Sequence, residues 1–444
     1  MNNCLRENKE ALINYFAEGA KPCANELNER SVGIELEHII LGPQDIPMPY
    51  TSPDGGVRDV LEALRVRYPI TTFSHGQLIG LARGKSTITI EPSAQLELSS
   101  GPFRSLKDAY QTFTTFEKEL ASVLKPMDAH AITIGYDPYY AALDKPLIPK
   151  DRYEYMHTYL SKISPYGPCM MRCSASTQIS IDYTDERDAI HKMRLASVMA
   201  PLLALMCDNA PTFEGEPRKE RCVRTRIWKQ MDPTRASSVP GITRSDFSFA
   251  DYAEYILGVP AIVTLKEDGT NAFSKKTFKK LYKQRQMTTQ DIEHALSMVF
   301  PDVRLKHYIE IRPADSMPIP YVIAYAALIK GLLYPAESRN ALDELFGDIL
   351  RRDIDDAKEE IMAYGYNAIV YGCNVGDLCD ALITIASQGL SEAEKHYLDP
   401  LALLVESRHS FADLGGTIEP LELLKTVQDV TLHPSDKAQE TPDA

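Results

Sequence analysis

The sequence predicts one large α/β or α+β unit with a helical C-terminal part. Strand-like segments with period-two alternation lie between helical segments through the first three quarters of the 444 residues, a pattern typical of a sheet covered by helices. From Asn340 to about Arg408 the spacing of apolar residues is mostly helical. The composition, 44% hydrophobic and 25% charged, is that of a globular protein long enough to bury a large core.

Helices are expected in three places before the C-terminal part. Residues 11–21 precede the first strand-like segment, and residues 186–209 form a long apolar helix with Pro201 as a candidate kink. Residues 104–124 are amphipathic because their apolar side chains recur at helical spacing; these are Leu106, Tyr110, Phe113, Phe116 and Leu120. The last residues, 433–444, are polar and are expected to be a disordered tail.

The first strand-like segment, residues 31–41, carries two acidic side chains on one face. Glu35 and Glu37 alternate with Ile34 and Leu36, so an extended backbone points both glutamates to the same side, about 7 Å apart. Two like charges on one face of a buried strand repel each other and lose hydration. The segment therefore raises the question of which cation compensates them.

Three further segments place polar groups on one face of a strand. Their polar positions are Gln95, Glu97 and Ser99 in the first; Ser174, Ser176, Gln178, Ser180 and Asp182 in the second; and Arg304, Lys306, Tyr308, Glu310 and Arg312 in the third. Glu91 lies just before the first of these, ahead of a proline and outside the clean alternation. The ordinary explanation is a solvated face of an antiparallel sheet. The excess of glutamate, which is depleted in strands, instead favours a site.

If these strands are neighbours, five carboxylates converge on one concave surface. At an effective dielectric constant of about 20, each close pair repels by several kcal/mol, and protonation or bound cations would relieve this. Oxygen ligands select Mg²⁺ or Mn²⁺ rather than zinc, and Mg²⁺ on carboxylates commonly holds a nucleoside triphosphate. The sequence Gly84-Lys85-Ser86-Thr87 resembles the end of a P-loop. However, Ile79 occupies the position where that motif requires its first glycine, and a strand follows where a P-loop is followed by a helix. Any nucleotide is therefore expected on the sheet.

Charge and cysteine content narrow the class of protein. The net charge of −14 and the pI of about 5.3 argue against nucleic acid or an anionic membrane as the main partner. The first ten residues are too polar for a signal peptide, and the longest nearly apolar run, residues 195–207, is too short to span a bilayer. Eight scattered cysteines without a CxxC indicate a reduced protein, which we expect to be cytoplasmic. Cys169 and Cys173 are expected to be buried thiols, with a redox switch as the alternative.

Six segments of the chain form an ordered set of motifs: VGIELE, GKSTITIEPSAQLELS, PKDRYEYMHTYL, TQISIDY, RIWKQMDPTR and RLKHYIEIRPAD. They occur in the order seen in the plant-type glutamate–cysteine ligases, and over residues 11 to 334 the chain resembles that family. The resemblance implies an α+β fold, with a curved, mainly antiparallel sheet, helices on its outer face and a core similar to that of glutamine synthetase. It implies a catalytic core over residues 1–335 and a helical region packed on it over residues 336–432.

The resemblance also assigns residues to roles. The implied metal ligands are Glu35, Glu37, Glu91, Glu97, Gln178 and Glu310, and the implied substrate contacts are Arg235, Trp228, Arg152 and Tyr153. Arg235 would grip a substrate carboxylate, and Arg312 would face the transferred phosphate, with Glu310 beside it. Lys85 would approach nucleotide or glutamate. Without the resemblance, Trp228 is more typical of a core residue, and Arg152 and Tyr153 of a surface pair at the start of a helix.

The implied activity is ATP-dependent and requires Mg²⁺, with Mn²⁺ as an alternative. The γ-carboxylate of L-glutamate would be phosphorylated to γ-glutamyl phosphate, and the amine of L-cysteine would displace phosphate to give γ-glutamylcysteine, the first step of glutathione-type thiol synthesis. Ser93 and Ala94 replace two glycines of the family motif, and RPADSMP replaces a glycine-rich stretch. A γ-glutamyl ligase for another amine therefore stays open, as does a non-catalytic sensor of glutamate or nucleotide. A monomer or homodimer is expected.

Overall fold

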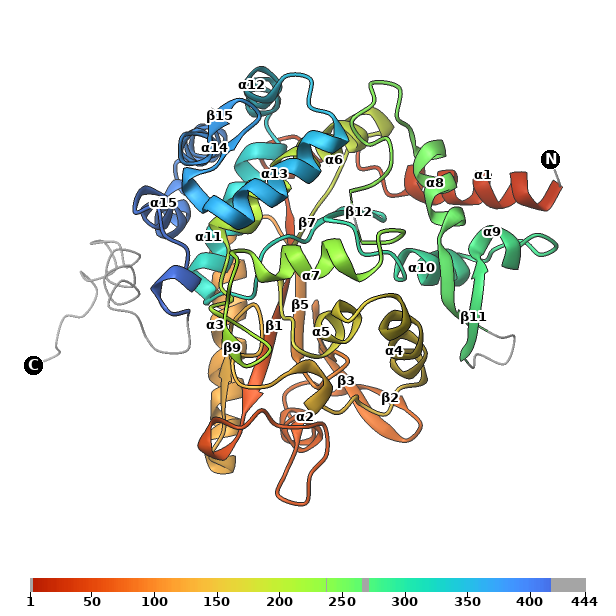
Figure 1. The fold of residues 1–444 in the computed structure, drawn as a ribbon, viewed down its shortest axis with the longest axis vertical. Coiled ribbons are helices and arrows are strands. Elements are labelled where there is room, and N and C mark those ends of the chain that lie inside the picture. The colour runs from red at the N-terminus through yellow and green to blue at the C-terminus, as the bar shows by residue number, and fades with distance from the viewer. Residues whose placement is uncertain (1–2, 237, 266–270, 417–444) are drawn as a thin grey trace, which may run out of the picture.

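A nine-stranded antiparallel sheet runs through the centre of the computed structural model (Figure 1). The structure describes residues 3–236, 238–265 and 271–416. The strand order is β12-β13-β7-β1-β5-β4-β3-β2, with β6 also paired to β1. The strands of this sheet are β1 (Val32–Leu41), β2 (Ile70–Ser74), β3 (Gln77–Arg83), β4 (Ser86–Ile90), β5 (Leu96–Phe103), β6 (His130–Ile132), β7 (Thr177–Ile181), β12 (Val303–Leu305) and β13 (Ile309–Ile311).

Three small hairpins stand apart from this sheet. They are β8 (Thr212–Phe213) with β9 (Glu216–Pro217), β10 (Pro260–Leu265) with β11 (Asn271–Thr277), and β14 (Ile369–Val370) with β15 (Cys373–Asn374). Short 3-10 turns occupy Pro43–Asp45, Lys125–Met127, Ala142–Asp144, Gly365–Asn367, Lys395–Leu398 and Ala412–Leu414. The segment after Lys85 forms β4, as expected for a hairpin and not for a P-loop.

The alternation seen in the sequence separates the two faces of the sheet. On the apolar face, Ile34 and Leu36 of β1, Leu98 of β5, Ile179 of β7 and Ile309 of β13 are fully buried. On the other face, Glu37 lies opposite Glu97, and Glu35 lies opposite Gln178. The antiparallel register therefore gathers the polar positions of separate strands into one area, because side chains two residues apart share a face.

Helices pack on the apolar face. The helix α3 (Leu106–Leu124) lies against β5 and β6, and α11 (Ile319–Leu333) lies against β1 and β7. The Ser105 hydroxyl caps α3 by accepting from the backbone amide of Asp108 at 3.4 Å, and its buried stripe includes Phe113, Phe116 and Leu120. The helix α6 (Glu186–Met206) packs against β12 and β13 and continues through Pro201. A further helix, α2 (Val57–Leu64), lies on β3.

The C-terminal helices form an outer layer over α6 and α11 (Figure 1). They are α12 (Ala336–Phe346), α13 (Arg351–Tyr364), α14 (Val375–Gly389) and α15 (Asp399–Glu406). Their presence confirms the helical pattern from Asn340 to Arg408, while the division near residue 335 stays a prediction. The expected tail at 433–444 lies outside the described residues. Of the described helices, α6 is long and apolar enough to cross a membrane, and 83% of its most apolar stretch is buried within the fold.

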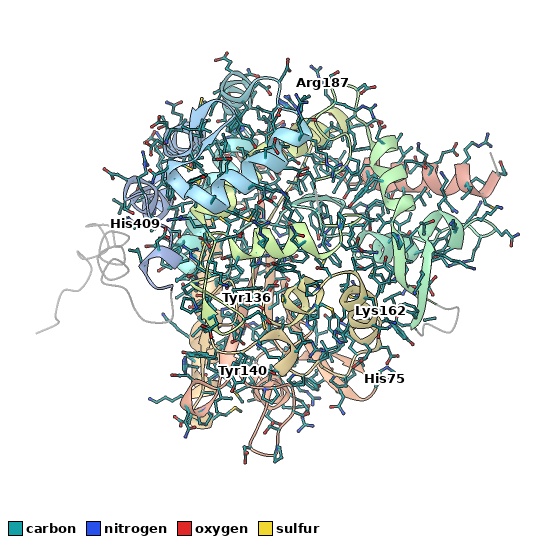
Figure 2. The ribbon with its side chains drawn as sticks, in the orientation of Figure 1. His75, Tyr136, Tyr140, Lys162, Arg187 and His409 are labelled. Atoms are coloured by element: carbon teal, nitrogen blue, oxygen red, sulfur yellow. The ribbon has the colours of Figure 1, made fainter. Side chains whose placement is uncertain are left out.

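A second set of helices covers the polar face of the sheet. They are α4 (Asp151–Ile163), α5 (Tyr166–Arg172) and α7 (Val223–Met231). To one side lie α1 (Asn3–Glu18), α8 (Phe249–Gly258), α9 (Phe278–Leu281) and α10 (Thr289–Leu296) (Figure 1). His75, in the turn between β2 and β3, lies 3.2 Å from Asp151 at the start of α4 (Figure 2). The β2–β3 hairpin and α4 therefore meet at the rim of the covered face.

Candidate active site

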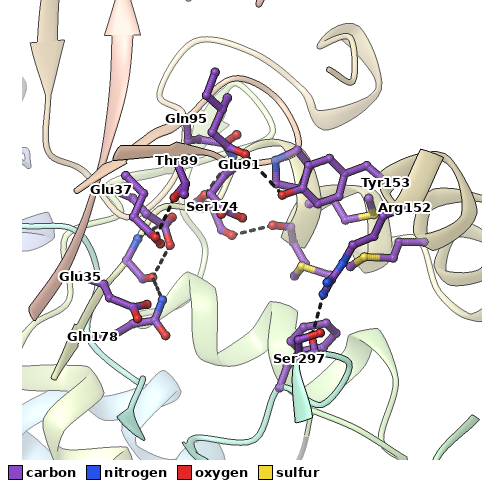
Figure 3. Close-up of a pocket in the computed structure, with 18 of the residues that line it drawn as sticks. Glu35, Glu37, Thr89, Glu91, Gln95, Arg152, Tyr153, Ser174, Gln178 and Ser297 are labelled. Atoms are coloured by element: carbon purple, nitrogen blue, oxygen red, sulfur yellow. Dashed lines mark hydrogen bonds between the residues drawn. The ribbon is translucent and has the colours of Figure 1, made fainter. Parts of the chain in front are cut away.

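A pocket of about 450 Å³ opens on the polar face of the sheet. Its floor comes from β1, β3, β4, β5 and β7, and its walls come from α4, α5 and α7 together with Phe300, Arg304 and Arg312. Figure 3 shows Glu35, Glu37 and Gln178 on one side of this space, with Arg152 and Tyr153 across it. Four of the five glutamates singled out in the sequence line it, so separate strands contribute to one site.

The carboxylates of the pocket are held by neutral donors. Glu37 accepts from the hydroxyl of Ser176 at 2.7 Å and from the backbone amide of Ser176 at 3.1 Å. Glu97 accepts from the hydroxyls of Thr89 at 3.0 Å and of Ser99 at 2.9 Å. These contacts fix the two carboxylates in place on adjacent strands. They add no positive charge to the acidic side of the pocket.

Burial dominates the protonation of these carboxylates. It raises the pKa of Glu35 and of Glu37 to about 8 and that of Glu97 to about 7, and repulsion from neighbouring glutamates adds to each increase. Burial also raises the pKa of Glu91, opposed in part by Lys150 and Arg152. At neutral pH these groups cannot all be ionised at once. A bound cation would let them ionise together.

Basic side chains occupy the opposite side of the pocket. Lys150, Arg152 and Arg224 line it, and the guanidinium of Arg152 donates to the carbonyl of Ser297 at 2.8 Å. The ring of Trp228 lies 6.0 Å from the Arg224 guanidinium. The carboxylates thus lie on β1 and β5 and just after β4, and basic side chains of α4 and α7 face them, while Arg304 and Arg312 line the pocket from the β12–β13 side. Such a surface suits an anionic ligand that also carries a metal ion.

Glu310 lies behind this pocket and does not line it. It is fully buried, and its carboxylate contacts Arg304 at 2.6 Å, Lys306 at 2.9 Å and Arg312 at 2.8 Å. Burial alone would raise the pKa of Glu310, but these three cations hold it well below its ordinary value. Both oxygens already face cations, so Glu310 holds basic side chains in place and is not a free metal ligand in this arrangement.

The four carboxylates that line the pocket are chemically suited to bind a divalent metal ion. The donors are oxygens only, and the raised pKa values of three of them mark negative charge that lacks a partner. Mg²⁺ prefers this donor type and is commonly held by one or two carboxylates plus phosphates and water. Among the described residues, no three His, Cys, Asp or Glu side chains are grouped closely enough to form a complete metal site by themselves. The ion would therefore need oxygens from a bound ligand.

Comparison with known proteins identifies the family. Residues 31–404 match the model of glutamate–cysteine ligase family 2 (GCS2). The chain belongs to this family. Among its relatives is the chloroplastic glutamate–cysteine ligase B of Oryza sativa subsp. japonica, 28% identical over 86% of this chain and 77% of that protein. The chloroplastic glutamate–cysteine ligase of Arabidopsis thaliana is 27% identical over 86% of this chain and 73% of that protein.

The fold agrees with the family. The glutamate–cysteine ligase (gshA) of Francisella tularensis in complex with AMP superposes with a TM-score of 0.55 at 12% identity, covering 93% of this chain and 90% of that one. The resemblance, the ligase class and the antiparallel sheet are thus confirmed.

The expected cytoplasmic location is wrong, because the relatives from rice, Arabidopsis, tomato and others are chloroplastic by name. That expectation rested on the scattered cysteines and the polar N-terminus, and neither feature distinguishes the cytoplasm from another reducing compartment.

Arg235 is not in the pocket, which corrects its assignment as the substrate-gripping arginine. Its guanidinium is fully buried and donates to Asp232 at 2.7 Å, to the carbonyl of Met298 at 2.8 Å and to the carbonyl of Pro260 at 2.8 Å. The group also lies over the ring of Tyr159. Arg235 ties α7 to β10 and to the end of α10, and because its side chain is fully buried outside the pocket it presents no donor to a ligand there.

Lys85 lies next to the pocket and not within it. It lines a neighbouring cavity of about 250 Å³, whose other lining residues include Lys21, Ser180 and Tyr308. Glu35 and Thr87 line both spaces, so the cavity continues the pocket along the sheet. The expectation that Lys85 approaches a ligand of this site remains a prediction with this geometry behind it.

Several residues of the pocket escaped the sequence analysis. Arg224 is 2% exposed, donates to the carbonyl of Ala314 at 2.8 Å, and has a buried Nε with no hydrogen-bond partner among the described residues. Its spacing of four residues from Trp228 was a usable signal, because residues at i and i+4 share a helix face. Other residues of the pocket that the sequence did not indicate include Lys150, Met156, Met170, Met171 and Phe300. Most of these are apolar, and composition alone does not separate such residues from the core.

Proposed function

We propose that this protein is an ATP-dependent ligase that joins the γ-carboxylate of L-glutamate to the α-amine of L-cysteine, giving γ-glutamylcysteine. Membership of glutamate–cysteine ligase family 2 supports the two substrates. The observation that carries the assignment to this pocket is its division in charge. Carboxylates on β1 and β5 and just after β4 face basic side chains on α4 and α7 across one cavity. A nucleotide with its metal ion suits the first side, and an amino-acid carboxylate suits the second.

Glu35, Glu37, Glu91 and Glu97 are the residues that would hold Mg²⁺ or Mn²⁺. The metal, when bound, supplies positive charge to the phosphates of ATP. Without it, the raised pKa values of Glu35 and Glu37 keep part of this set protonated at neutral pH. Ser176 orients Glu37, and Thr89 and Ser99 orient Glu97, so these two ligands stay in place before the nucleotide arrives.

In the first step, a γ-carboxylate oxygen of glutamate attacks the terminal phosphorus of ATP. The new oxygen–phosphorus bond forms as the bond to the bridging oxygen breaks, and ADP leaves. Negative charge on the transferred oxygens is stabilised by the guanidinium of Arg312, which Glu310 holds at 2.8 Å. Trp228 lies 5.9 Å from this guanidinium and limits its movement away from the pocket.

In the second step, the amine of cysteine attacks the acyl carbon of γ-glutamyl phosphate. The nitrogen–carbon bond forms, the carbon–oxygen bond to phosphate breaks, and the amine releases a proton. No thiol of the protein is needed as a nucleophile. Cys169 and Cys173 are buried and free, and burial raises the pKa of each thiol to about 12, so neither is a reactive thiolate at neutral pH.

Arg152 and Arg224 take the carboxylate-binding role that Arg235 cannot perform. Both line the pocket, and the buried Nε of Arg224 still lacks a partner. An arginine suits this task because its planar guanidinium donates two parallel hydrogen bonds to a carboxylate. The apolar wall formed by Met156, Met170 and Met171 faces the same space and suits the carbon chain of an amino acid.

The test is phosphate release from ATP with L-glutamate and a panel of amines. Release that requires both glutamate and cysteine, with γ-glutamylcysteine identified by mass spectrometry, is the expected result. A higher kcat/KM with another amine would show that this amine, and not cysteine, is the second substrate. Tight binding of ATP with no amine-dependent phosphate release would overturn the assignment as a ligase. Glu37→Gln, which removes one carboxylate of the pocket, should abolish the release.

A further inference from the structure

Gln178 links Arg312 to the acidic side of the site. Its side-chain oxygen accepts a hydrogen bond from the Nη1 of Arg312, and its side-chain nitrogen donates to the hydroxyl of Ser176 at 3.3 Å. Ser176 in turn donates to Glu37 at 2.7 Å. Because the oxygen of the amide must face the guanidinium and its nitrogen must face the hydroxyl, this network fixes the orientation of the amide. Figure 3 shows Gln178 beside Glu35 and close to Glu37.

The pairing of strands places this bridge. Ile311, the last residue of β13, lies opposite Ile179 of β7, so Arg312, which follows it, reaches the level of Gln178. On the other side of β7, Gln178 lies opposite Glu35 of β1. Gln178 and Ser176 are two residues apart and share the polar face. A side chain at position 178 therefore lies between Arg312, just after β13, and the carboxylates of β1.

This geometry does not suit a metal ligand. The amide oxygen is already in contact with a guanidinium, and Gln178 is 5% exposed. A divalent cation on that oxygen would lie close to the positive charge of Arg312, where like charges repel by several kcal/mol at an effective dielectric constant of about 20. Arg312 also contacts Glu310. The guanidinium is therefore held from two sides, by a carboxylate and by an amide.

We propose that Gln178 is a positioning residue that fixes Arg312 for the transferred phosphate and couples it, through Ser176, to Glu37 on the metal side. This proposal rests on the proposed function for the role of Arg312. The coupling is a chain of hydrogen bonds from Arg312 through Gln178 and Ser176 to Glu37. A movement of Glu37 when the nucleotide and its metal bind would thus change the position of Arg312.

The variant that tests this is Gln178→Met, which keeps the length of the side chain and removes both polar ends. The expected result is a fall in kcat of about tenfold to a hundredfold, as for other residues that orient a functional group. The Kd of the nucleotide-free protein for Mn²⁺, measured by electron paramagnetic resonance, should be unchanged. Gln178→Glu, which can still accept from Arg312, should recover part of kcat. Ile179→Val, on the opposite face of β7, is the control for a general loss of stability.

A double-mutant cycle completes the test. In an Arg312→Ala background, Gln178→Met should lower kcat no further. The change in urea midpoint of the double variant should differ from the sum of the changes in the two single variants. A Kd for Mn²⁺ weakened about tenfold or more by Gln178→Met would show a metal ligand and overturn the proposal. Additive effects in both measurements would overturn it as well. Mn²⁺ binding and urea unfolding need no turnover, so they decide the role of Gln178 even if the wild-type protein proves to have no ligase activity.

Discussion

Arg235 and Asp232 form an ion pair with 2.7 Å between Nε and Oδ2, and both side chains are enclosed by the fold. The pair closes the turn that follows α7, and the carbonyls of Met298 and Pro260 accept from the two terminal nitrogens of the arginine. A buried arginine with its partners supplied in this way stabilises the structure around it. The DPTR segment therefore supports the wall of the pocket and leaves the pocket itself to other residues.

Arg235→Lys should lower stability and leave glutamate binding nearly intact. A lysine cannot reach three partners with one ammonium group, so Asp232 and two carbonyls lose donors. Breaking a buried ion pair costs about 3 to 5 kcal/mol, which differential scanning fluorimetry would report as a clearly lower Tm. The KM for L-glutamate of the folded fraction should stay close to the wild-type value. An unchanged Tm with a greatly raised KM would contradict this account.

Arg224→Lys should raise the KM for L-glutamate by about tenfold or more, because the bidentate contact to the carboxylate is lost while the charge is kept. The matched control is Arg226→Lys on the same helix. Arg226 pairs with Glu220 and Glu359 outside the pocket, and this variant should keep the wild-type KM. Steady-state kinetics at saturating ATP and cysteine measures both. Equal KM values in the two variants would remove Arg224 from the substrate site.

Glu35→Gln should make the metal-free protein more stable at pH 8. The folded-state pKa of Glu35 is raised from 4.5 to about 8, so the folded protein binds more protons than the unfolded chain between these values. The stability associated with this group is present at pH 4.5 and is lost as the pH rises through 8. A neutral glutamine avoids that loss, and a gain of about 4 kcal/mol at pH 8 is expected as an upper value.

Urea unfolding with a chelator present, at pH 5 and at pH 8, measures this difference between Glu35→Gln and the wild-type protein. The two proteins should be similar at pH 5 and should diverge as the pH rises. Glu62→Gln on α2 is the control, since Glu62 pairs with Arg65 at 2.9 Å far from the pocket. If the variant is less stable than the wild type at pH 8, the ionised carboxylate of Glu35 is stabilised by its surroundings, and this prediction is wrong.

Glu310→Gln should destabilise the protein without weakening metal binding. The change leaves Arg304, Lys306 and Arg312 facing a neutral amide, and buried charges that lose their partner cost about 3 to 5 kcal/mol. Titration of the metal-free variant with Mn²⁺ should give the wild-type Kd, whereas Glu37→Gln should raise the Kd. A Kd raised equally by both changes would restore Glu310 as a metal ligand.

The sequence was sufficient to predict which side chains lie on the polar face of the sheet, but not which strands pair with one another. Period-two alternation places Glu35, Glu37 and Glu97 on one side of their strands, and the structure confirms this side. The alternation carries no information on which strands are neighbours or in what register. The pairing of Glu35 with Gln178 and of Glu37 with Glu97 therefore became visible only in the folded sheet.

The assignments that changed concern side chains whose donors or acceptors are already in use. Arg235 and Glu310 have the residue types that a substrate or metal site needs, but Asp232 occupies the first, and three cations occupy the second. Such competition depends on contacts between segments far apart in the chain. Arg224 escaped the sequence analysis for the opposite reason, since its free donor is apparent only once α7 lies over the sheet.

The measurement that tests the central claim most directly uses L-glutamate labelled with ¹⁸O in its γ-carboxylate. Turnover with ATP and L-cysteine should yield γ-glutamylcysteine and inorganic phosphate that carries one ¹⁸O atom from glutamate for each peptide formed, because the carboxylate oxygen stays with the phosphorus when the amide forms. Mass spectrometry reads both products from one reaction. Unlabelled phosphate, or labelled phosphate with no γ-glutamylcysteine, would contradict the assignment of this pocket as the site of glutamate–cysteine ligation.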